Sequence, residues 1–265
     1  MSNEDDFDDQ PGRPTATPAV RSTLGCLVTI LAVGWGIVAL YYFGSPRITG
    51  AVHRMNTSSK LKQMSLAFHI HHDSVGVMPA NSYDADGKPL LSWRVHILPY
   101  IEEDNLYRRF RLDEPWDGPN NRQLLNEMPR MYASAVTDRG VRGTRTFFRG
   151  FATRGAVMEP RPAKIVNGGH WLHWRPDGLT MKDFADGTSN TILIIEAGDP
   201  VEWTKPDDLT WDGTQPLPAL GGDRDTAEFQ IALADGSVRS VKKTVRPEQL
   251  KAAITYNGKE TETLD

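Results

Sequence analysis

The sequence has a single cysteine, Cys26, among 265 residues, and almost no excess of charge of either sign. One cysteine excludes a disulfide within the chain and a structural zinc site built from several cysteines. Acidic and basic residues number 34 and 30, so the chain lacks the basic excess of proteins that bind nucleic acid through its phosphates. Hydrophobic residues are only 39% of the total, which excludes a multispanning membrane protein. We therefore predict a mostly water-facing chain with no nucleic-acid partner.

The first 22 residues contain almost nothing apolar. Five of them are acidic, against the two arginines Arg13 and Arg21, and three are prolines. Such a segment cannot bury enough surface to offset the entropy of ordering it. We predict a disordered acidic tail over residues 1–22.

An uncharged run of twenty residues, Leu24–Phe43, follows the tail. As a helix it would be roughly 30 Å long, which matches the hydrocarbon core of a bilayer. A lipoprotein would have its cysteine after the apolar run, and a cleaved signal peptide would have a shorter run. We therefore predict a transmembrane helix over residues 23–44, with the lipid bilayer as a partner, and a body over residues 45–265.

The body begins with a helical pattern and continues with strand patterns. Leu61, Met64 and Phe68 recur at helical spacing, which predicts a helix from Ile48 to about Asp73. Val52 and Met55 form a similar stripe one stretch earlier. Short helical or mixed segments are expected over 90–107, 120–128 and 246–254, and strands within 144–157 and over 191–196, 229–233 and 237–241. The last two flank a hairpin turn, and the expected fold class is α+β, a helix followed by an antiparallel sheet.

The best candidates for metal ligands are His69, His72 and Asp73. On a helix, His69 lies one turn before the other two, which is a suitable spacing for shared ligation. The cluster lacks an H-E-x-x-H pattern and an obvious distant ligand, and histidines near a helix C-terminus also suit the helix dipole. We predict no metal and no other cofactor. The stretch from Asp84 to Gly87 resembles the opening of a calcium loop without the later ligands, so it is expected to be a turn.

No segment matches a catalytic motif. Residues 187–191 lack the second glycine of a nucleophile elbow, and they precede a strand, whereas an elbow follows one. No P-loop or dinucleotide-binding motif occurs, and the acidic pairs 102–103 and 207–208 are interpreted as ordinary solvated charges. We predict that the protein is not an enzyme. A turn is expected instead from the polar side chains of Asp186, Thr188, Ser189 and Asn190.

Seven tryptophans raise the alternative of a surface on which sugar rings stack, although large aromatic side chains more often fill cores or cover loops. They are Trp35, Trp93, Trp116, Trp171, Trp174, Trp203 and Trp211.

Several stretches of the body resemble, in order, those of a bacterial family known as domain of unknown function 1559 (DUF1559), which is abundant in planctomycetes. Together they cover roughly residues 51–245. The stretches are Lys60–Met64, His69–Asp73, Ala85–Val95, Leu98–Glu102, Glu114–Asn121, Met128-Pro129, Asp186–Ile192, Glu202–Pro206 and Ala234–Val238.

The family is similar to type II secretion pseudopilins and type IV pilins. This resemblance implies a membrane helix that runs into a second helix packed on an antiparallel sheet, with a cytoplasmic N-terminus and a periplasmic domain at the inner membrane. Counting the basic residues that flank the apolar run gives the opposite orientation. We adopt the orientation implied by the resemblance, because a long folded domain is translocated largely regardless of flanking charge. The family-motif residues interpreted as structural turns are Asp186, Gly187, Thr188, Ser189, Asn190, Asp235 and Gly236.

The chain departs from the prepilin pattern at its start. Prepilins have a glycine before an apolar residue and a glutamate at the fifth mature position, whereas here Gly25 precedes Cys26 and Ile30 occupies the fifth position. Relatives also often have a cysteine after the tyrosine that corresponds to Tyr132, where this chain has Ala133. A redox role at that position is therefore not expected.

Three hypotheses follow from the sequence. The first is a non-enzymatic, single-pass membrane protein with a structural or interaction role among pilin-like subunits or envelope proteins. The second is a membrane-anchored binding module for glycan or peptide, based on the tryptophan-rich stretch 171–211. The third is a metal-dependent enzyme that uses His69, His72 and Asp73. The sequence does not name a ligand.

Overall fold

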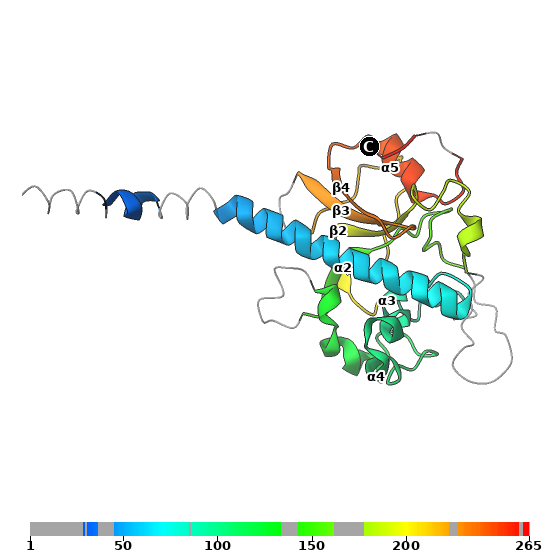
Figure 1. The fold of residues 1–265 in the computed structure, drawn as a ribbon. Coiled ribbons are helices and arrows are strands. Elements are labelled where there is room, and N and C mark those ends of the chain that lie inside the picture. Colours follow the sequence, from blue (N-terminus) through cyan, green and yellow to red (C-terminus); the bar gives the residue numbers. More distant parts are fainter. Residues whose placement is uncertain are drawn as a thin grey trace, which may run out of the picture. The chain divides into compact units, whose positions relative to one another are not determined.

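The computed structural model describes residues 29, 31–36, 45–84, 86–133, 143–161, 178–222, 227–259 and 262–264 (Figure 1). The chain divides into two compact units, residues 1–52 and 53–265, which are described separately. In the first unit, residues 31–36 are helical and exposed.

The acidic tail over residues 1–22 lies outside the described residues, and so does the apolar run 24–43 apart from residue 29 and residues 31–36. Within the described part of the chain, no helix has both the length and the apolar character that a membrane crossing requires. The transmembrane helix over residues 23–44 stays a prediction, together with the boundaries at its two ends.

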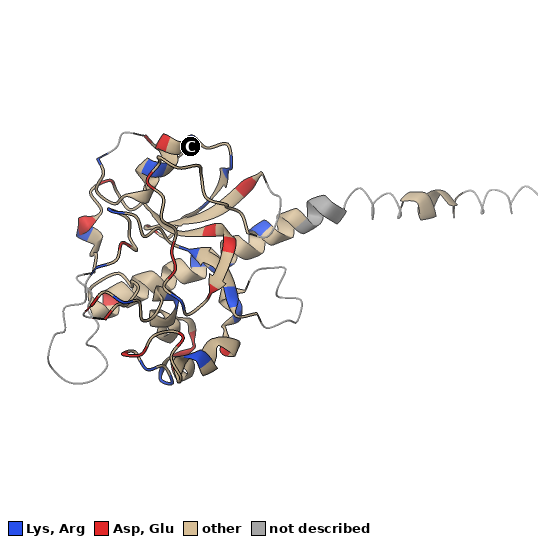
Figure 2. Cartoon of the chain, turned by 180° about the vertical axis from the view of Figure 1, so that it is seen from behind, with Lys and Arg blue, Asp and Glu red and all other residues tan. Residues whose placement is uncertain are grey.

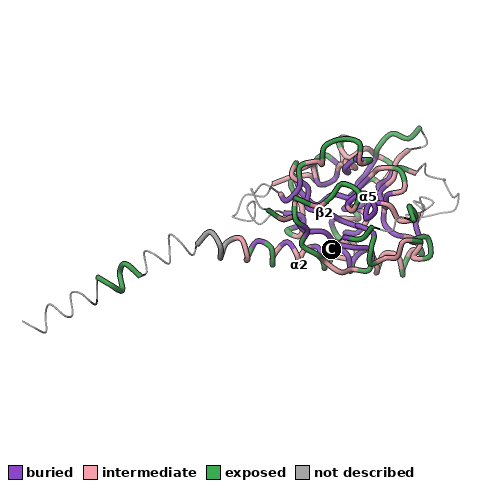
Figure 3. Tube along the Cα trace, turned by 90° about the horizontal axis from the view of Figure 1, so that it is seen from above, coloured by how far each residue is buried: buried purple, intermediate pink, exposed green. Residues whose placement is uncertain are grey.

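The longest helix, α2, runs from Ser45 to Val75, close to the expected bounds. It ends at Gly76, which has a φ of 89° and whose N–H donates to the carbonyl one turn earlier over 2.7 Å. A left-handed glycine is a common end of a helix. Leu61, Met64 and Phe68 are each 0% exposed, so the helical spacing identified the buried face correctly. Buried and exposed residues alternate along α2 (Figure 3).

Four strands form one antiparallel sheet in the order β1-β2-β3-β4, so each strand pairs with its neighbour in the sequence. The expected hairpin joins β3 and β4, and Gly236 in its turn has a φ of 85°, which favours glycine. β2 continues beyond the strand expected over residues 191–196. The strands are β1 (Arg145–Arg149), β2 (Ile192–Glu202), β3 (Glu228–Leu233) and β4 (Val238–Lys242).

Of the short helices in the described residues, five lie between α2 and the sheet, one lies between β1 and β2, and one follows the sheet. The expected mixed segment over residues 90–107 contains three of them, and the helix expected over residues 246–254 is present as α5. The short elements are α3 (Trp93–His96), η2 (Leu98–Ile101), α4 (Asp104–Tyr107), η3 (Asn121–Glu127), η4 (Arg130–Tyr132), η5 (Met181–Asp183) and α5 (Pro247–Ile254).

The helix expected over residues 120–128 is a 3₁₀ helix, η3, rather than an α-helix. Its first residue, Asn121, is 0% exposed and is bonded outside the helix. The Asn121 amide donates to the carbonyls of Arg111, Glu114 and Pro115 over 2.8, 3.0 and 3.2 Å, and its Oδ1 accepts the Arg111 N–H. These bonds fix the loop that precedes η3, and this loop is the family stretch Glu114–Asn121.

The sheet separates two hydrophobic cores, because neighbouring residues of a strand point to opposite faces. The pairing of β2 with β3 is irregular between Ile192 and Ile194, so the neighbours Leu193 and Ile194 belong to the same core. One core contains the buried face of α2, the short helices after it, and Leu193 and Ile194 of β2. The other contains Ile192 and Ile195 of the same strand together with α5. Figure 1 shows α2 crossing in front of the sheet. A helix packed on an antiparallel sheet confirms the α+β class.

Candidate functional site

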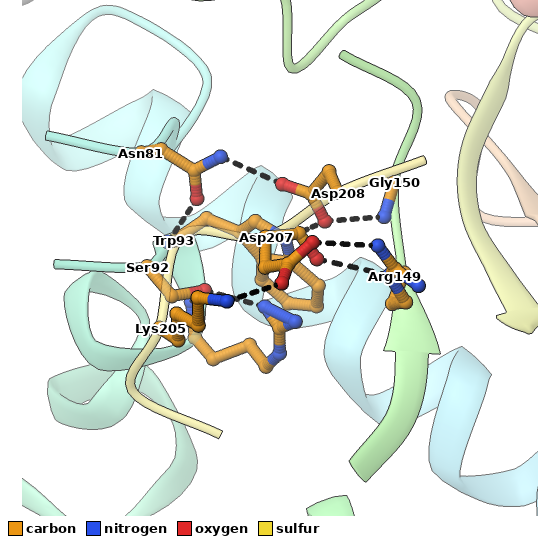
Figure 4. Close-up of polar contacts among 9 residues, drawn as sticks. Asn81, Ser92, Trp93, Arg149, Gly150, Lys205, Asp207 and Asp208 are labelled. Atoms are coloured by element: carbon orange, nitrogen blue, oxygen red, sulfur yellow. Dashed lines mark hydrogen bonds and ion pairs between the residues drawn. The ribbon is translucent and has the colours of Figure 1, made fainter. Parts of the chain in front are cut away.

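Nine residues form a polar cluster where three distant segments meet (Figure 4). One segment enters α3, one leaves β1, and the third follows β2. Two of the segments include stretches that resembled the family, around Trp93 and around Lys205. The polar cluster consists of Asn81, Ser92, Trp93, Arg94, Arg149, Gly150, Lys205, Asp207 and Asp208.

Asp208 is the acceptor at the centre of the polar cluster, and it is only 7% exposed. Its carboxylate accepts hydrogen bonds from Asn81 Nδ2 at 2.6 Å, from the Gly150 N–H at 2.7 Å, and from Trp93 Nε1 at 3.4 Å. The Asn81 Oδ1 in turn accepts the Trp93 backbone N–H at 3.0 Å. Asp208 therefore joins all three segments.

Arg94 is the buried cation of the cluster, with 0% of its surface exposed. Its Nη1 donates to Ser92 Oγ over 2.5 Å, and its guanidinium carbon lies 4.9 Å from the centre of the Trp93 ring. Within the described chain, its Nε and Nη2 are enclosed and have no hydrogen-bond partner. Burial lowers the pKa of the Arg94 guanidinium, and the charge of Asp208 acts in the opposite direction. Asp208 is thus the main compensating charge for Arg94.

The outer side of the cluster is a second group of charges around Asp207. Arg149 Nη2 lies 2.8 Å from one oxygen of Asp207, and Lys205 Nζ lies 2.7 Å from the other. Desolvation alone would raise the pKa of Asp207, but the hydrogen bond from Lys205 and the charge of Arg149 leave that pKa below its ordinary value. The Lys205 side chain is 42% exposed, so the cluster reaches the surface here.

The chemistry of the polar cluster is that of a structural centre. The Asp208 carboxylate accepts hydrogen bonds from two other segments of the chain, and Arg94 is enclosed, so both groups hold these segments together. The interpretation of residues 207–208 as ordinary solvated charges was wrong for Asp208. No local pattern could have shown this, because its partner Asn81 lies 127 positions away in the sequence.

The three candidate metal ligands have different surroundings. His72 Nδ1 lies 3.5 Å from an oxygen of Asp73, whose side chain is 82% exposed. The Nε2 atom of His69 is enclosed beside Gly236 instead. A Cβ atom added to Gly236 would lie 3.5 Å from this nitrogen. Within the described residues, no three histidine, cysteine or acidic side chains are grouped as metal ligands. The carboxylate of Asp84 accepts two backbone N–H groups at 3.0 and 2.7 Å, as the predicted turn requires.

The two family motifs predicted as turns lie next to each other. The Asp235 N–H donates to the Thr188 carbonyl over 3.0 Å, and Asn190 Nδ2 donates to the Asp186 carbonyl over 2.9 Å. The Asp186 carboxylate also accepts the N–H groups of residues 258 and 259, at 2.6 and 2.8 Å. Gly187 has a φ of 91°. The motifs therefore join the β3–β4 turn, the start of β2 and the segment after α5.

Most of the described body tryptophans are in the cores. Trp93 and Trp203 are 0% exposed and Trp211 is 4% exposed. Trp203 stacks on Tyr132 with ring centres 5.8 Å apart, and its Nε1 donates to a backbone carbonyl. Trp171 and Trp174 lie outside the described residues. Because they are buried, Trp203 and Trp211 do not form part of a surface on which sugar rings could stack.

A buried pair that the sequence did not indicate joins α2 to the sheet. His53 Nε2 lies 3.1 Å from Glu196 Oε1, with 6% and 7% of the two side chains exposed. Glu196 is on β2, 143 positions from His53. Together with the hydrophobic core, this contact fixes α2 against the sheet.

The side of α2 that faces away from the sheet is partly apolar. Val52, Met55, Leu66 and Ile70 are 56, 73, 59 and 40% exposed. Leu66 lies about three helical turns after Met55, and Ile70 lies about one turn after Leu66. The three side chains are therefore on the same face of α2. We call these four residues the outer face of α2. The stripe that the sequence showed at Val52 and Met55 thus points to solvent, away from the core.

The helix, the antiparallel sheet and the two cores define an α+β domain. Residues 51–228 match the family described as "Protein of unknown function (DUF1559)". Since the match covers more than half of the chain, the protein belongs to this family, as the sequence motifs predicted. Comparison with curated proteins and comparison with solved structures each give no significant match.

Proposed function

We propose that the protein is a single-pass membrane protein with a pilin- or pseudopilin-like domain, which has a structural or interaction role in a secretion- or pilus-like assembly of the cell envelope. Its short N-terminus would be cytoplasmic and its domain periplasmic, at the inner membrane. Its partners would be the lipid bilayer and other pilin-like subunits or envelope proteins. The observation that carries this proposal is the outer face of α2.

Single exposed apolar side chains are normal on protein surfaces, whereas an aligned row of them indicates an interaction site. Side chains three and four positions apart form the ridges by which helices pack. The buried face of α2 already contacts the sheet, so the outer face is a second apolar surface of the same helix. An outer apolar face is what a helix needs when it packs against neighbouring subunits.

The attachment of α2 to α3 and to the sheet also supports an assembly role. Phe68 packs edge-on against Trp93 with ring centres 5.1 Å apart, and His53 bonds Glu196 on β2. A helix held at several points transmits a contact on its outer side to the whole domain.

Disulfide crosslinking tests the outer face. In a chain with Cys26→Ser, a single cysteine at Met55 or Leu66 is expected to give a crosslinked species in native membranes under mild oxidation, measured on non-reducing gels. The matched control is Arg108→Cys, directly after α4, whose side chain is 71% exposed. Equal crosslinking at all three positions, or none at the two α2 positions, would contradict the proposal.

Labelling of a cysteine added after Asp265 tests the topology. In spheroplasts of a Cys26→Ser chain, a membrane-impermeant maleimide is expected to label this cysteine without permeabilisation. A cysteine at Ser2 serves as the control and is expected to react only after permeabilisation. Labelling of the C-terminal cysteine from the cytoplasm alone would refute the periplasmic orientation.

The glycan-binding alternative has less support. Two of the tryptophans on which it rested, Trp203 and Trp211, fill the cores.

A further inference from the structure

β4 is an edge strand of the sheet. Some of its backbone groups bond β3, and the others face away from β3. The Leu233 N–H donates to the Ser237 carbonyl, and the Lys243 N–H donates to the carbonyl of residue 227, over 2.9 and 2.8 Å. The register continues between these pairs through Arg239 and Val241. In an antiparallel ladder, hydrogen-bonded and non-hydrogen-bonded residues alternate along a strand. The backbone groups of residues 238, 240 and 242 therefore face away from β3.

These outward groups form a free edge in the described chain. The Lys242 carbonyl accepts the Val245 N–H at 3.0 Å, and the other outward groups have no backbone partner among the described residues. Ser240 and Lys242 are exposed. At the opposite edge of the sheet, by contrast, Leu209 forms a parallel bridge with Phe151 just beyond β1. The β4 edge is thus the more open side of the sheet.

Charge distinguishes this edge from the rest of the surface. Basic and acidic residues are intermixed over most of the chain (Figure 2). Residues 238–246 contain four basic residues and no acidic one. Of the four, Arg246 is paired with Glu262 at 2.7 Å, and Arg239 Nη1 donates to the Leu264 carbonyl at 3.1 Å. Glu228 on β3 lies opposite Lys242 and accepts a hydrogen bond from Ser240 at 2.7 Å. The edge therefore combines outward strand groups with an excess of basic over acidic side chains.

We propose that the β4 edge binds an extended acidic segment of a partner protein, which adds to the sheet as a fifth strand. Strand addition supplies backbone hydrogen bonds, and the alternating side chains of the incoming strand supply specificity. A second copy of β4 would place lysines and arginines opposite each other, which is unfavourable across a strand pair. Acidic side chains opposite Arg239, Lys242 and Lys243 would be favourable instead. This surface is separate from the outer face of α2, and the proposal is independent of the membrane anchor.

A binding experiment with the full chain in detergent micelles tests the proposal. The probe is a fluorescently labelled peptide of alternating valine and glutamate, followed by anisotropy, and a peptide of alternating valine and lysine is the control. The acidic peptide is expected to bind at least about tenfold more tightly. Hydrogen exchange is expected to slow at the N–H groups of Val238, Ser240 and Lys242 when it binds.

Two substitutions at Ser240 distinguish the contribution of its backbone N–H to peptide binding from the contribution of its side chain. Ser240→Pro removes an outward N–H and leaves the bonds to β3 intact, so the affinity for the acidic peptide is expected to fall about tenfold, as expected for the loss of about one hydrogen bond. Ser240→Ala also loses the hydroxyl contacts to Glu228 and Gln230 but keeps the N–H, and it is expected to bind like the parent chain. Lys242→Glu is expected to weaken binding without any change to the backbone, which keeps the test valid if Ser240→Pro does not fold.

Three results would overturn the proposal. One is equal binding of both peptides, and another is protection of amides elsewhere than on β4. The third is slow exchange at the outward β4 amides of the peptide-free chain together with self-association, since this would identify a second copy as the occupant.

Discussion

Replacement of Asp208 by alanine is expected to lower the free energy of unfolding by about 3–5 kcal/mol. The change removes a buried carboxylate whose charge favours the charged form of the enclosed Arg94 guanidinium, and an uncompensated buried charge has a cost of this order. It also leaves the donors of Asn81, Trp93 and Gly150 without an acceptor. Urea unfolding followed by tryptophan fluorescence measures the difference.

Asp104→Ala is the matched control for this experiment. Asp104 also pairs with an arginine, Arg108, at 2.6 Å, but the two side chains are 48% and 71% exposed. A surface pair of this kind contributes less than about 1 kcal/mol. If Asp208→Ala were no more destabilising than Asp104→Ala, the polar cluster would not be a structural centre.

The second large expected effect is a loss of stability in mild acid that depends on His96. Its Nε2 is enclosed and has no hydrogen-bond partner in the described chain. Burial, together with the charge of His71, lowers the pKa of His96 from 6.5 to about 3. Burial also lowers the pKa of His71.

The direction of the effect follows from these pKa values. Between pH 6.5 and about 3 the unfolded chain binds a proton at His96 that the folded chain does not bind, so stability falls as the pH falls. The slope from one such group is at most about 1.4 kcal/mol per pH unit. We expect the protein to lose about 2 kcal/mol from this residue between pH 6.5 and pH 4.5, with the full contribution present above pH 6.5.

His96→Phe is expected to flatten the dependence over this range, measured as urea midpoints at several pH values. His72→Phe is the control, because His72 lies in the last turn of α2, where its Nδ1 is 3.5 Å from an oxygen of the exposed Asp73. The assignment to His96 fails if both variants retain the slope of the parent chain.

The parts of the fold that the sequence predicted are those determined by neighbouring residues. Leu61, Met64 and Phe68 define α2 because the helical period is a local property. The hairpin at Gly236 was predicted because an Ala-Asp-Gly turn between apolar stretches is local as well. The 3₁₀ form of η3 was not predicted, because it depends on bonds from Asn121 to a preceding loop.

The polar cluster was missed for the same reason. Nothing beside Asp208 in the sequence shows that it meets Asn81, Trp93 and Gly150, since each of these lies at least 58 positions away. Two of the three segments contain stretches that resemble the family, but the resemblance does not say why these residues are needed. The structure gives a physical reason, because a charge buried in one segment requires a partner in another.

The position of α2 in the chain has a consequence for biosynthesis. Leu61 and Met64 share a core with Leu193 and Ala232, which are more than a hundred residues further along. At a synthesis rate of ~5–20 residues per second, α2 waits on the order of ten seconds before β2 and β3 exist. During this time the outer face and the residues of α2 that contact the sheet are uncovered, while the short helices after α2 are already made. Exposed apolar surface of this kind favours aggregation, so we expect the nascent chain to be most prone to aggregate before β2 and β3 are made.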